Sequence, residues 1–225
     1  MLKELFHEEG IEVWGLRARA GTPPEPDLSL LGEDERRRAE AMRRADQRAG
    51  YLAAHAALRE LLGRRLGIHP AAVPFLRERC PRCGGNHGRP AVSSARAALH
   101  FSLSRRGEVA LIAVARAPVG VDIEALPDAG TVAATASLLH PLERAELAAV
   151  SPSRRPALFA RLWTRKEAYL KGVGVGLADD LRAEYVGAGE RAGAPAGWRI
   201  VDLALPVRAG EFGDFEGAVA VEVGS

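Results

Sequence analysis

The spacing of apolar residues divides the chain into short strand-like runs and longer helix-like segments. Runs rich in β-branched residues and bounded by glycine or proline predict strands at residues 11–18, 73–76, 99–103, 109–115, 119–124, 198–205 and 218–223. Apolar positions that recur every three or four residues predict helices at residues 33–62, 130–139, 141–149 and 153–171. Helices and strands therefore mix along the whole chain, which favours an α+β (mixed α/β) fold.

The length of the chain allows one large domain or two smaller halves. Its 225 residues are enough for two units of about 110 residues, each with an apolar core. We expect an N-terminal half at residues 1–117 and a C-terminal half at residues 118–225, because each contains both helices and strands. No sequence repeat relates the two.

Composition and charge exclude several classes of protein. Hydrophobic residues make up 47% of the chain, so folding does not require a partner. A net charge of +2 and 5% aromatic residues do not suit a nucleic-acid-binding surface, although the arginines of residues 36–48 keep an RNA- or DNA-binding module as an alternative. The acidic start and the shortness of the longest apolar run, residues 109–115, predict a cytoplasmic protein with no membrane segment.

The pentapeptide GVDIE, residues 120–124, places two carboxylates side by side. In a strand Asp122 and Glu124 share one face, while Val121 and Ile123 share the other. Such a pair repels unless a cation lies between the two carboxylates, and Mg²⁺ suits oxygen ligands. Taken alone, the pattern is more typical of an amphipathic strand with a solvated acidic face.

The predicted helix at residues 153–171 contains an unexpected charge. Lys166 falls on its apolar face, where a charge is costly without a buried anionic partner or a route by which the long side chain reaches water. Trp163, Glu167 and Lys171 form a stripe with a spacing of four residues. Glu167 and Lys171 fit an ordinary surface pair, but Lys166 indicates that a site is present nearby.

Two loop segments carry groups that can contact phosphate or metal. Arg89 lies in a glycine–proline turn, and Ser104 and Arg105 lie at a strand end, which suits phosphate oxygens. Cys80 and Cys83 with His87 resemble a zinc site, but a structural site needs four ligands, the fourth from His69 or His100. Three ligands alone favour reduced, partly buried cysteines in a loop.

Four motifs occur in the order GRP, FSLS, GVDIE and W-x-x-KEA-x-x-K-x-x-G-x-GL. This order and spacing resembles that of the 4′-phosphopantetheinyl transferases of the surfactin-synthetase-activating type. The resemblance covers about residues 33–180 and is most specific at residues 120–124 and 163–177. It implies two pseudo-symmetric halves, each a small sheet packed with helices, with the active site at their interface.

The resemblance also implies a role for each matching residue. Asp122, Glu124 and Glu167 would surround one Mg²⁺, or Mn²⁺, bound to the pyrophosphate of coenzyme A. Glu167 or a metal-bound water would take the proton from the acceptor serine, and Lys171 would contact the phosphates. The adenosine-phosphate end of coenzyme A would be held by Arg48, Arg89, Ser104 and Arg105, the last in place of the histidine usual in the family.

The implied reaction moves 4′-phosphopantetheine from coenzyme A to a serine of an apo acyl or peptidyl carrier protein and releases adenosine 3′,5′-bisphosphate. The resemblance leaves open whether the carrier serves fatty acid, polyketide or nonribosomal peptide synthesis. We expect a monomer, because a chain with two halves can build the cleft internally. The alternative is a non-catalytic relative that only binds carrier proteins, against which the intact Asp122, Glu124, Glu167 and Lys171 argue.

Overall fold

The computed structural model describes residues 2–8, 10–18, 21, 27–93, 98–175, 181–205 and 215–224. Its strands are β1 (Lys3–Glu8), β2 (Ile11–Arg17), β3 (Phe75–Arg77), β4 (Pro90–Val92), β5 (His100–Arg106), β6 (Val109–Ala115), β7 (Val119–Ala125), β8 (Trp198–Asp202) and β9 (Phe215–Glu222). Its α-helices are α1 (Glu33–Glu40), α2 (Ala45–Leu66), α3 (Ala129–Thr135), α4 (Pro141–Ala149) and α5 (Arg155–Val173). Short 3₁₀ helices lie at Leu28–Leu30, Pro70–Ala72, Ala136–Leu138 and Pro152–Arg154. The predicted α+β fold is confirmed.

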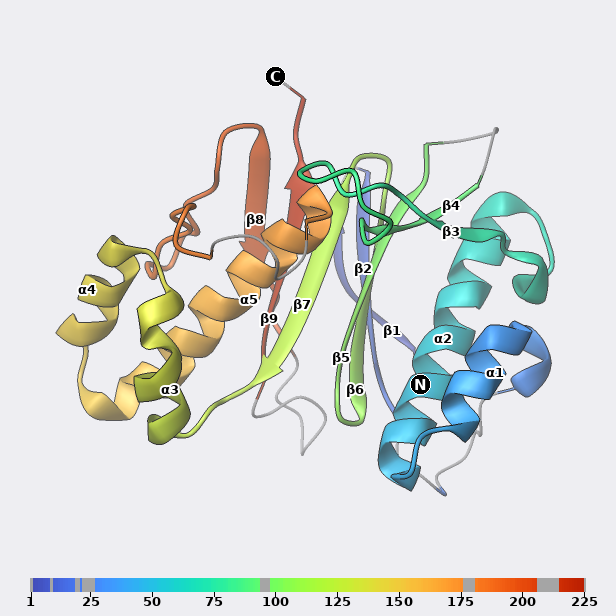
Figure 1. Cartoon of the computed structure of the whole chain (residues 1–225), viewed down its shortest axis with the longest axis horizontal. Coiled ribbons are helices and arrows are strands. Elements are labelled where there is room, and N and C mark those ends of the chain that lie inside the picture. Colours follow the sequence, from blue (N-terminus) through green and yellow to red (C-terminus); the bar gives the residue numbers. More distant parts are fainter. Residues whose placement is uncertain are drawn as a thin grey trace.

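The strands form three antiparallel sheets. One sheet has the order β1-β2-β6-β5, a second has the order β7-β9-β8, and β3 pairs with β4 in a small hairpin. In Figure 1 the two larger sheets lie in the middle, with α1 and α2 on one side and α3, α4 and α5 on the other. The chain passes from the first sheet to the second between β6 and β7.

Three apolar clusters hold these layers together. Alternate residues of β6 point to opposite faces: Leu111 packs against the second sheet, whereas Ile112 packs against α2. The same alternation in β9 places Val219 between the sheets and Ala220 against α5. Because both faces of β6 are covered, its sequence VALIAVA is apolar throughout and every residue of it is buried.

The single helix predicted at residues 33–62 is wrong, because the structure contains two helices there. Arg44 adopts an extended backbone (φ −90°, ψ 124°) and separates α1 from α2. The turn folds α1 back onto α2, where buried Glu35 accepts hydrogen bonds from Arg59 Nε at 2.5 Å and pairs with His55 Nδ1 at 2.9 Å. The break is therefore stabilised by tertiary contacts rather than by a glycine or proline.

The other predicted elements are present with shifted ends. The strand expected at residues 73–76 occurs as β3, which starts two residues later than predicted. The strand expected at residues 198–205 occurs as β8, which ends three residues earlier than predicted. Two strands were not predicted. β1 is a polar edge strand with mostly exposed residues, and β4 has only three residues.

Part of the last motif, residues 176–177, lies outside the described residues. Within the described part of the chain, no helix is both long enough and apolar enough to cross a lipid bilayer.

Candidate functional site

The two carboxylates of β7 point away from the core between the sheets. Val121 and Ile123 are buried in that core, as the alternating pattern predicts. Asp122 lies on the opposite face, toward α5, and retains only 3% exposure. Glu124 is half-buried on the same face. The sequence prediction that these two carboxylates share a face is confirmed.

Glycines allow α5 to lie directly against β7. A Cβ atom at Gly120 would stand 1.9 Å from the carbonyl oxygen of Ala168 in the helix. A Cβ atom at Gly172 would stand 2.5 Å from the ring of Trp198. No side chain fits at either position, so strand and helix backbones meet there. The close approach brings the stripe of α5 that carries Glu167 and Lys171 to the carboxylates of β7.

Asp122, Ser104 and Lys171 form one polar contact group from three different elements. Asp122 Oδ1 accepts hydrogen bonds from Ser104 Oγ at 2.7 Å and from Lys171 Nζ at 2.6 Å. Lys171 Nζ also donates to Ser104 Oγ at 2.9 Å. Ser104 Oγ in turn accepts from the backbone N–H of Ile123 at 3.4 Å. The hydroxyl therefore connects the edge of the first sheet to β7 and fixes the Asp122 carboxylate.

Two more carboxylates lie near this group, and their protonation is strongly affected. Burial, and then the charges of Asp122 and Glu124, raise the pKa of Glu167 to about 7, with Lys171 opposing the shift. Burial and Asp122 also raise the pKa of Glu124. Arg106 Nε lies 3.2 Å from Glu124 Oε2 and opposes that rise. The site therefore gathers more negative charge than its own cations neutralise.

One carboxylate oxygen of this group lacks a partner among the described residues. Asp122 Oδ2 is buried and has no hydrogen-bond partner in the described part of the chain. An orphaned carboxylate oxygen beside a glutamate with a raised pKa is the donor set that a divalent oxygen-seeking ion stabilises. However, the oxygens of the three carboxylates do not all lie within 4.8 Å of one another. Among the described Cys, His, Asp and Glu residues, only Cys80, Cys83 and His87 bring three ligand atoms that close together.

The basic residues expected to hold coenzyme A lie in two places. Arg89 donates through Nη1 to the carbonyl of Gly172 at 2.8 Å and through Nε to Glu78 at 2.7 Å, so it lies at the C-terminal end of α5. Arg105 donates to the carbonyl of Gln47 at 3.3 Å, at the first turn of α2, where Arg48 is the next residue. The structure thus groups Arg48 with Arg105, and Arg89 with the helix of Lys171.

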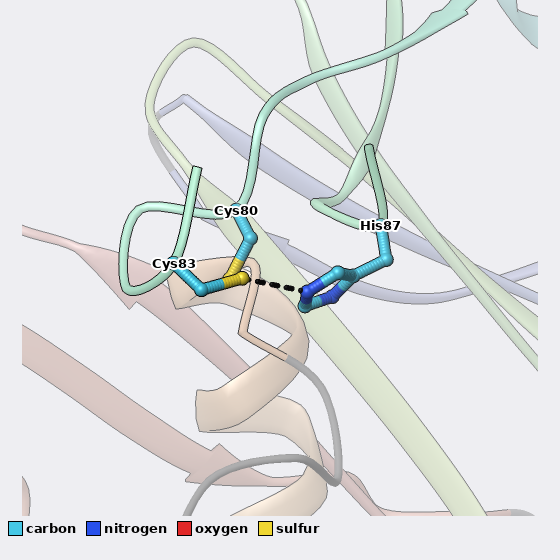
Figure 2. A group of neighbouring side chains, drawn as sticks. All are labelled: Cys80, Cys83 and His87. Atoms are coloured by element: carbon cyan, nitrogen blue, oxygen red, sulfur yellow. Dashed lines mark hydrogen bonds between the residues drawn. The ribbon is translucent and has the colours of Figure 1, made fainter. Parts of the chain in front are cut away.

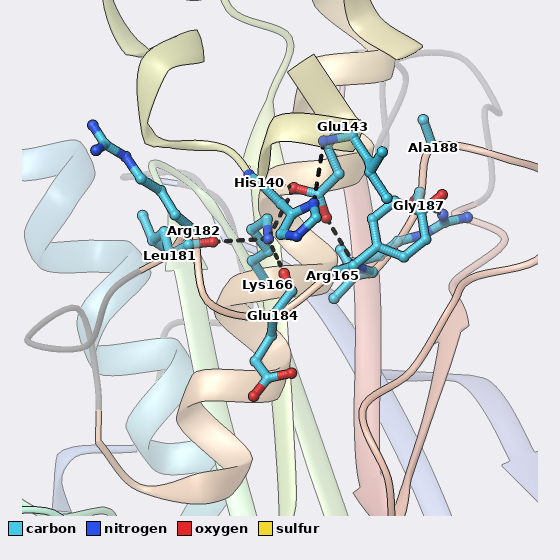
Figure 3. A network of polar contacts seen from close by, with 12 residues as sticks. His140, Glu143, Arg165, Lys166, Leu181, Arg182, Glu184, Gly187 and Ala188 are labelled. Atoms are coloured by element: carbon cyan, nitrogen blue, oxygen red, sulfur yellow. Dashed lines mark hydrogen bonds and ion pairs between the residues drawn. The ribbon is translucent and has the colours of Figure 1, made fainter. Parts of the chain in front are cut away.

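Lys166 has the buried anionic partner that its position required. Its Nζ lies 2.9 Å from Glu143 Oε2, and these side chains are 3% and 0% exposed. Nζ also donates to the carbonyls of Leu181, at 2.8 Å, and Glu184 (Figure 3). Glu143 accepts further hydrogen bonds from the backbone N–H groups of His140 and Val186, at 3.0 and 2.8 Å. Lys166 therefore joins α4, α5 and the 181–186 segment, and is not part of the carboxylate group.

Sequence reasoning missed two contributions to these networks. The sequence places Ser104 among the expected coenzyme A contacts, but it does not reveal that the Ser104 hydroxyl also bonds to Asp122 and Lys171. Glu143 was not singled out at all. The sequence does contain a signal for Glu143, because it stands three residues after His140 and completes a capping box at the start of α4.

Trp163, the first residue of the predicted stripe, stacks on Phe159, with ring centroids 5.6 Å apart, and so packs within the helical layer.

The chain is similar in sequence to known proteins. Residues 118–192 match the sequence profile described as the 4′-phosphopantetheinyl transferase superfamily. The chain is 32% identical over 154 residues to the 4′-phosphopantetheinyl transferase HetI of Nostoc sp.. The matched region covers 67% of this chain and 62% of that protein. It is 37% identical over 127 residues to the 4′-phosphopantetheinyl transferase AcpT of Salmonella typhi, covering 56% and 58%. It is 29% identical over 121 residues to a 4′-phosphopantetheinyl transferase of Bacillus subtilis, covering 54% and 50%. The chain thus spans less than two thirds of the length of each of these relatives.

Proposed function

Because residues 118–192 carry the 4′-phosphopantetheinyl transferase superfamily domain, we propose that this chain is such an enzyme. It transfers the 4′-phosphopantetheine group of coenzyme A to a serine of an apo acyl or peptidyl carrier protein. Within that superfamily we place it in the surfactin-synthetase-activating type, and the order of its motifs supports this placement. The observation that carries the proposal is the meeting of Asp122 and Lys171 beside the buried carboxyl group of Glu167.

In this proposal Asp122, Glu124 and Glu167 would hold a magnesium ion. Their side chains would have to move closer together to do so, because the oxygens of the three carboxylates do not all lie within 4.8 Å of one another. Support comes from Oδ2 of Asp122, which has no hydrogen-bond partner among the described residues, and from the raised pKa of both glutamates, which burial and then the neighbouring carboxylate charges cause. All the donors are carboxylate oxygens, which suits Mg²⁺ or Mn²⁺ better than a thiophilic metal. When bound, the ion neutralises and polarises the pyrophosphate of coenzyme A.

The side chains of α5 act on the transferring group. The acceptor serine oxygen forms a bond to the phosphorus of the phosphopantetheine group, and the phosphoanhydride bond breaks. Glu167 would take the proton of the serine hydroxyl, either directly or through a water molecule. Its pKa of about 7 applies without the ion, and bound Mg²⁺ would lower it. Lys171 places its positive charge beside the phosphate that leaves with adenosine 3′,5′-bisphosphate, where negative charge accumulates.

The remaining residues bind and position. Arg48, Arg89 and Arg105 hold the adenosine-phosphate end of coenzyme A through guanidinium–phosphate contacts. Ser104 keeps Asp122 and Lys171 in place through its hydroxyl. Because Ser104 belongs to residues 1–117 and Asp122 to residues 118–225, the site lies between the two proposed halves of one chain. A monomer therefore suffices, working in the cytoplasm.

The test is direct modification of a carrier protein. The protein is incubated with coenzyme A, Mg²⁺ and apo-carriers from fatty acid, polyketide and nonribosomal peptide synthesis, and each carrier is weighed by mass spectrometry. We expect at least one carrier to gain the mass of a phosphopantetheine group. Asp122→Asn should lose most of this transfer. Asp128→Asn, the matched control, should retain it, because Asp128 is exposed and caps α3. The absence of any mass gain with all three carrier classes would contradict the proposal.

A further inference from the structure

The loop between β3 and β4 brings two thiols and an imidazole together outside the carboxylate site. The ligand atoms of Cys80, Cys83 and His87 all lie within 4.8 Å of one another. Cys83 Sγ is 3.0 Å from His87 Nε2, and Figure 2 shows the three side chains converging from the two arms of the loop. Cys80 is buried, whereas Cys83 and His87 reach the surface. Both cysteines are free thiols.

The backbone of this loop is shaped to present the sulfur atoms. Gly84 N–H donates to the carbonyl of Cys80, and Cys80 N–H donates to the carbonyl of Gly85, both at 2.8 Å. Gly84 has a φ of +72°, which closes the turn and which a side chain would strain. The backbone N–H groups of Cys83 and Arg82 face the Cys80 sulfur, which suits a metal-bound thiolate.

The chemistry of the three side chains selects the ion. Two thiolates with two residues between them and one imidazole prefer a thiophilic ion of tetrahedral geometry over Mg²⁺ or Ca²⁺. We propose that Cys80, Cys83 and His87 bind one zinc ion, with a solvent molecule at its fourth position. The site is separate from the proposed magnesium site, which has oxygen donors only, and does not depend on the proposed transferase activity.

The zinc ion would fix the loop against the end of α5. Cys80 packs in an apolar cluster with Leu170 and Val175. Leu170 lies in the last turn of that helix, and Val175 follows it. At the end of the same loop, Arg89 donates to the carbonyl of Gly172 and pairs with Glu78. An ion that closes the loop at Cys80 and His87 therefore restrains the segment that carries Arg89.

Metal titration of the full-length protein tests the site. The protein is stripped with a chelator under reducing conditions and titrated with Zn²⁺, or with Co²⁺ as a spectroscopic substitute. We expect one Co²⁺ per chain with thiolate-to-metal charge-transfer absorption, which the carboxylate site cannot produce because it lacks sulfur. Cys83→Ser and His87→Ala should weaken Zn²⁺ binding by about 10- to 100-fold or more. His7→Ala is the matched control, because His7 is exposed on β1, where it pairs with Glu4.

Thiol labelling and melting provide readouts that do not involve catalysis. Zn²⁺ should protect Cys80 and Cys83 from alkylation and raise Tm in the wild-type protein and in His7→Ala, but not in Cys83→Ser. Labelling of both thiols at the same rate with and without Zn²⁺, or a charge-transfer band that survives in Cys83→Ser at full strength, would overturn the assignment. A protein that isolates only as a Cys80–Cys83 disulfide, and binds no Zn²⁺ after reduction, would also overturn it.

Discussion

Helix α5 carries two lysine–carboxylate pairs in very different surroundings. Lys166 and Glu143 are both fully buried, and the charged atoms of both contact several partners. Lys171 lies five residues further along the helix and pairs with Asp122 of β7. There the lysine is 30% exposed and one oxygen of the aspartate has no partner in the described part of the chain.

The difference separates a structural pair from a site that can act. A buried charge whose hydrogen bonds are satisfied holds elements together and has little reason to change its state. The group around Asp122 instead collects carboxylates that raise the pKa of Glu167, so it is held in a state that a cation or a proton would stabilise. The first pair therefore governs stability, and we expect the second to govern activity.

The largest effect on stability should come from Lys166→Met. It leaves the Glu143 carboxylate buried without a counter-charge, which should lower the free energy of unfolding by about 3–5 kcal/mol. Urea unfolding followed by circular dichroism measures the loss. The double variant Lys166→Met/Glu143→Gln removes the uncompensated charge and should recover part of it. If the double variant is no more stable than the single one, the ion pair is not the reason for the loss.

Asp122→Asn should have the opposite profile. We expect phosphopantetheine transfer to fall by about 100- to 1000-fold, because the substitution removes a charge that acts on the transferring group. Stability should stay the same or increase, since repulsion among the carboxylates decreases. Rate measurements with a carrier protein and a thermal melt test both halves of the statement. A large loss of Tm with retained transfer would reverse the comparison.

The pH dependence of stability should report the crowding around Glu167. Its pKa rises from 4.5 in a free side chain to about 7 in the fold, so the native state binds its proton more tightly than the unfolded state. Without divalent ions, stability should therefore fall as pH increases from about 4.5 to about 7, by at most about 3 kcal/mol. In Glu167→Gln this contribution should be absent. Identical pH profiles for the two proteins would show that Glu167 titrates normally.

Ser104→Ala should have the smallest effect of the four. It removes the hydroxyl that donates to Asp122 and accepts from Lys171, so transfer should slow by about tenfold, equivalent to about 1.4 kcal/mol. Ser102→Ala is the matched control, because Ser102 lies on the same strand and, among the described residues, its hydroxyl accepts from the N–H of Val121, at 3.1 Å, and does not contact Asp122 or Lys171. Equal losses in both variants would assign the serines a purely structural role.

Part of the candidate site could be predicted from the strand and helix periods alone. Alternation in GVDIE placed Asp122 and Glu124 on one face, and the four-residue spacing placed Glu167 and Lys171 on one side of a helix. The break between α1 and α2 was not predictable in this way, because it depends on Glu35 meeting Arg59 and His55 across 20 or more residues. Local patterns carry no information about such contacts.

The sequence by itself determined the α+β class, most of the elements and the residue types available for chemistry, because these follow from local periodicity and composition. Only the tertiary structure decided which charges meet. Lys166 and Lys171 are equally basic in sequence, yet the first is neutralised by Glu143 and the second contacts Asp122 and Ser104. The physical reason is that burial and the distance to an opposite charge depend on how β7, α4 and α5 pack, and glycines at positions 120 and 172 set that packing.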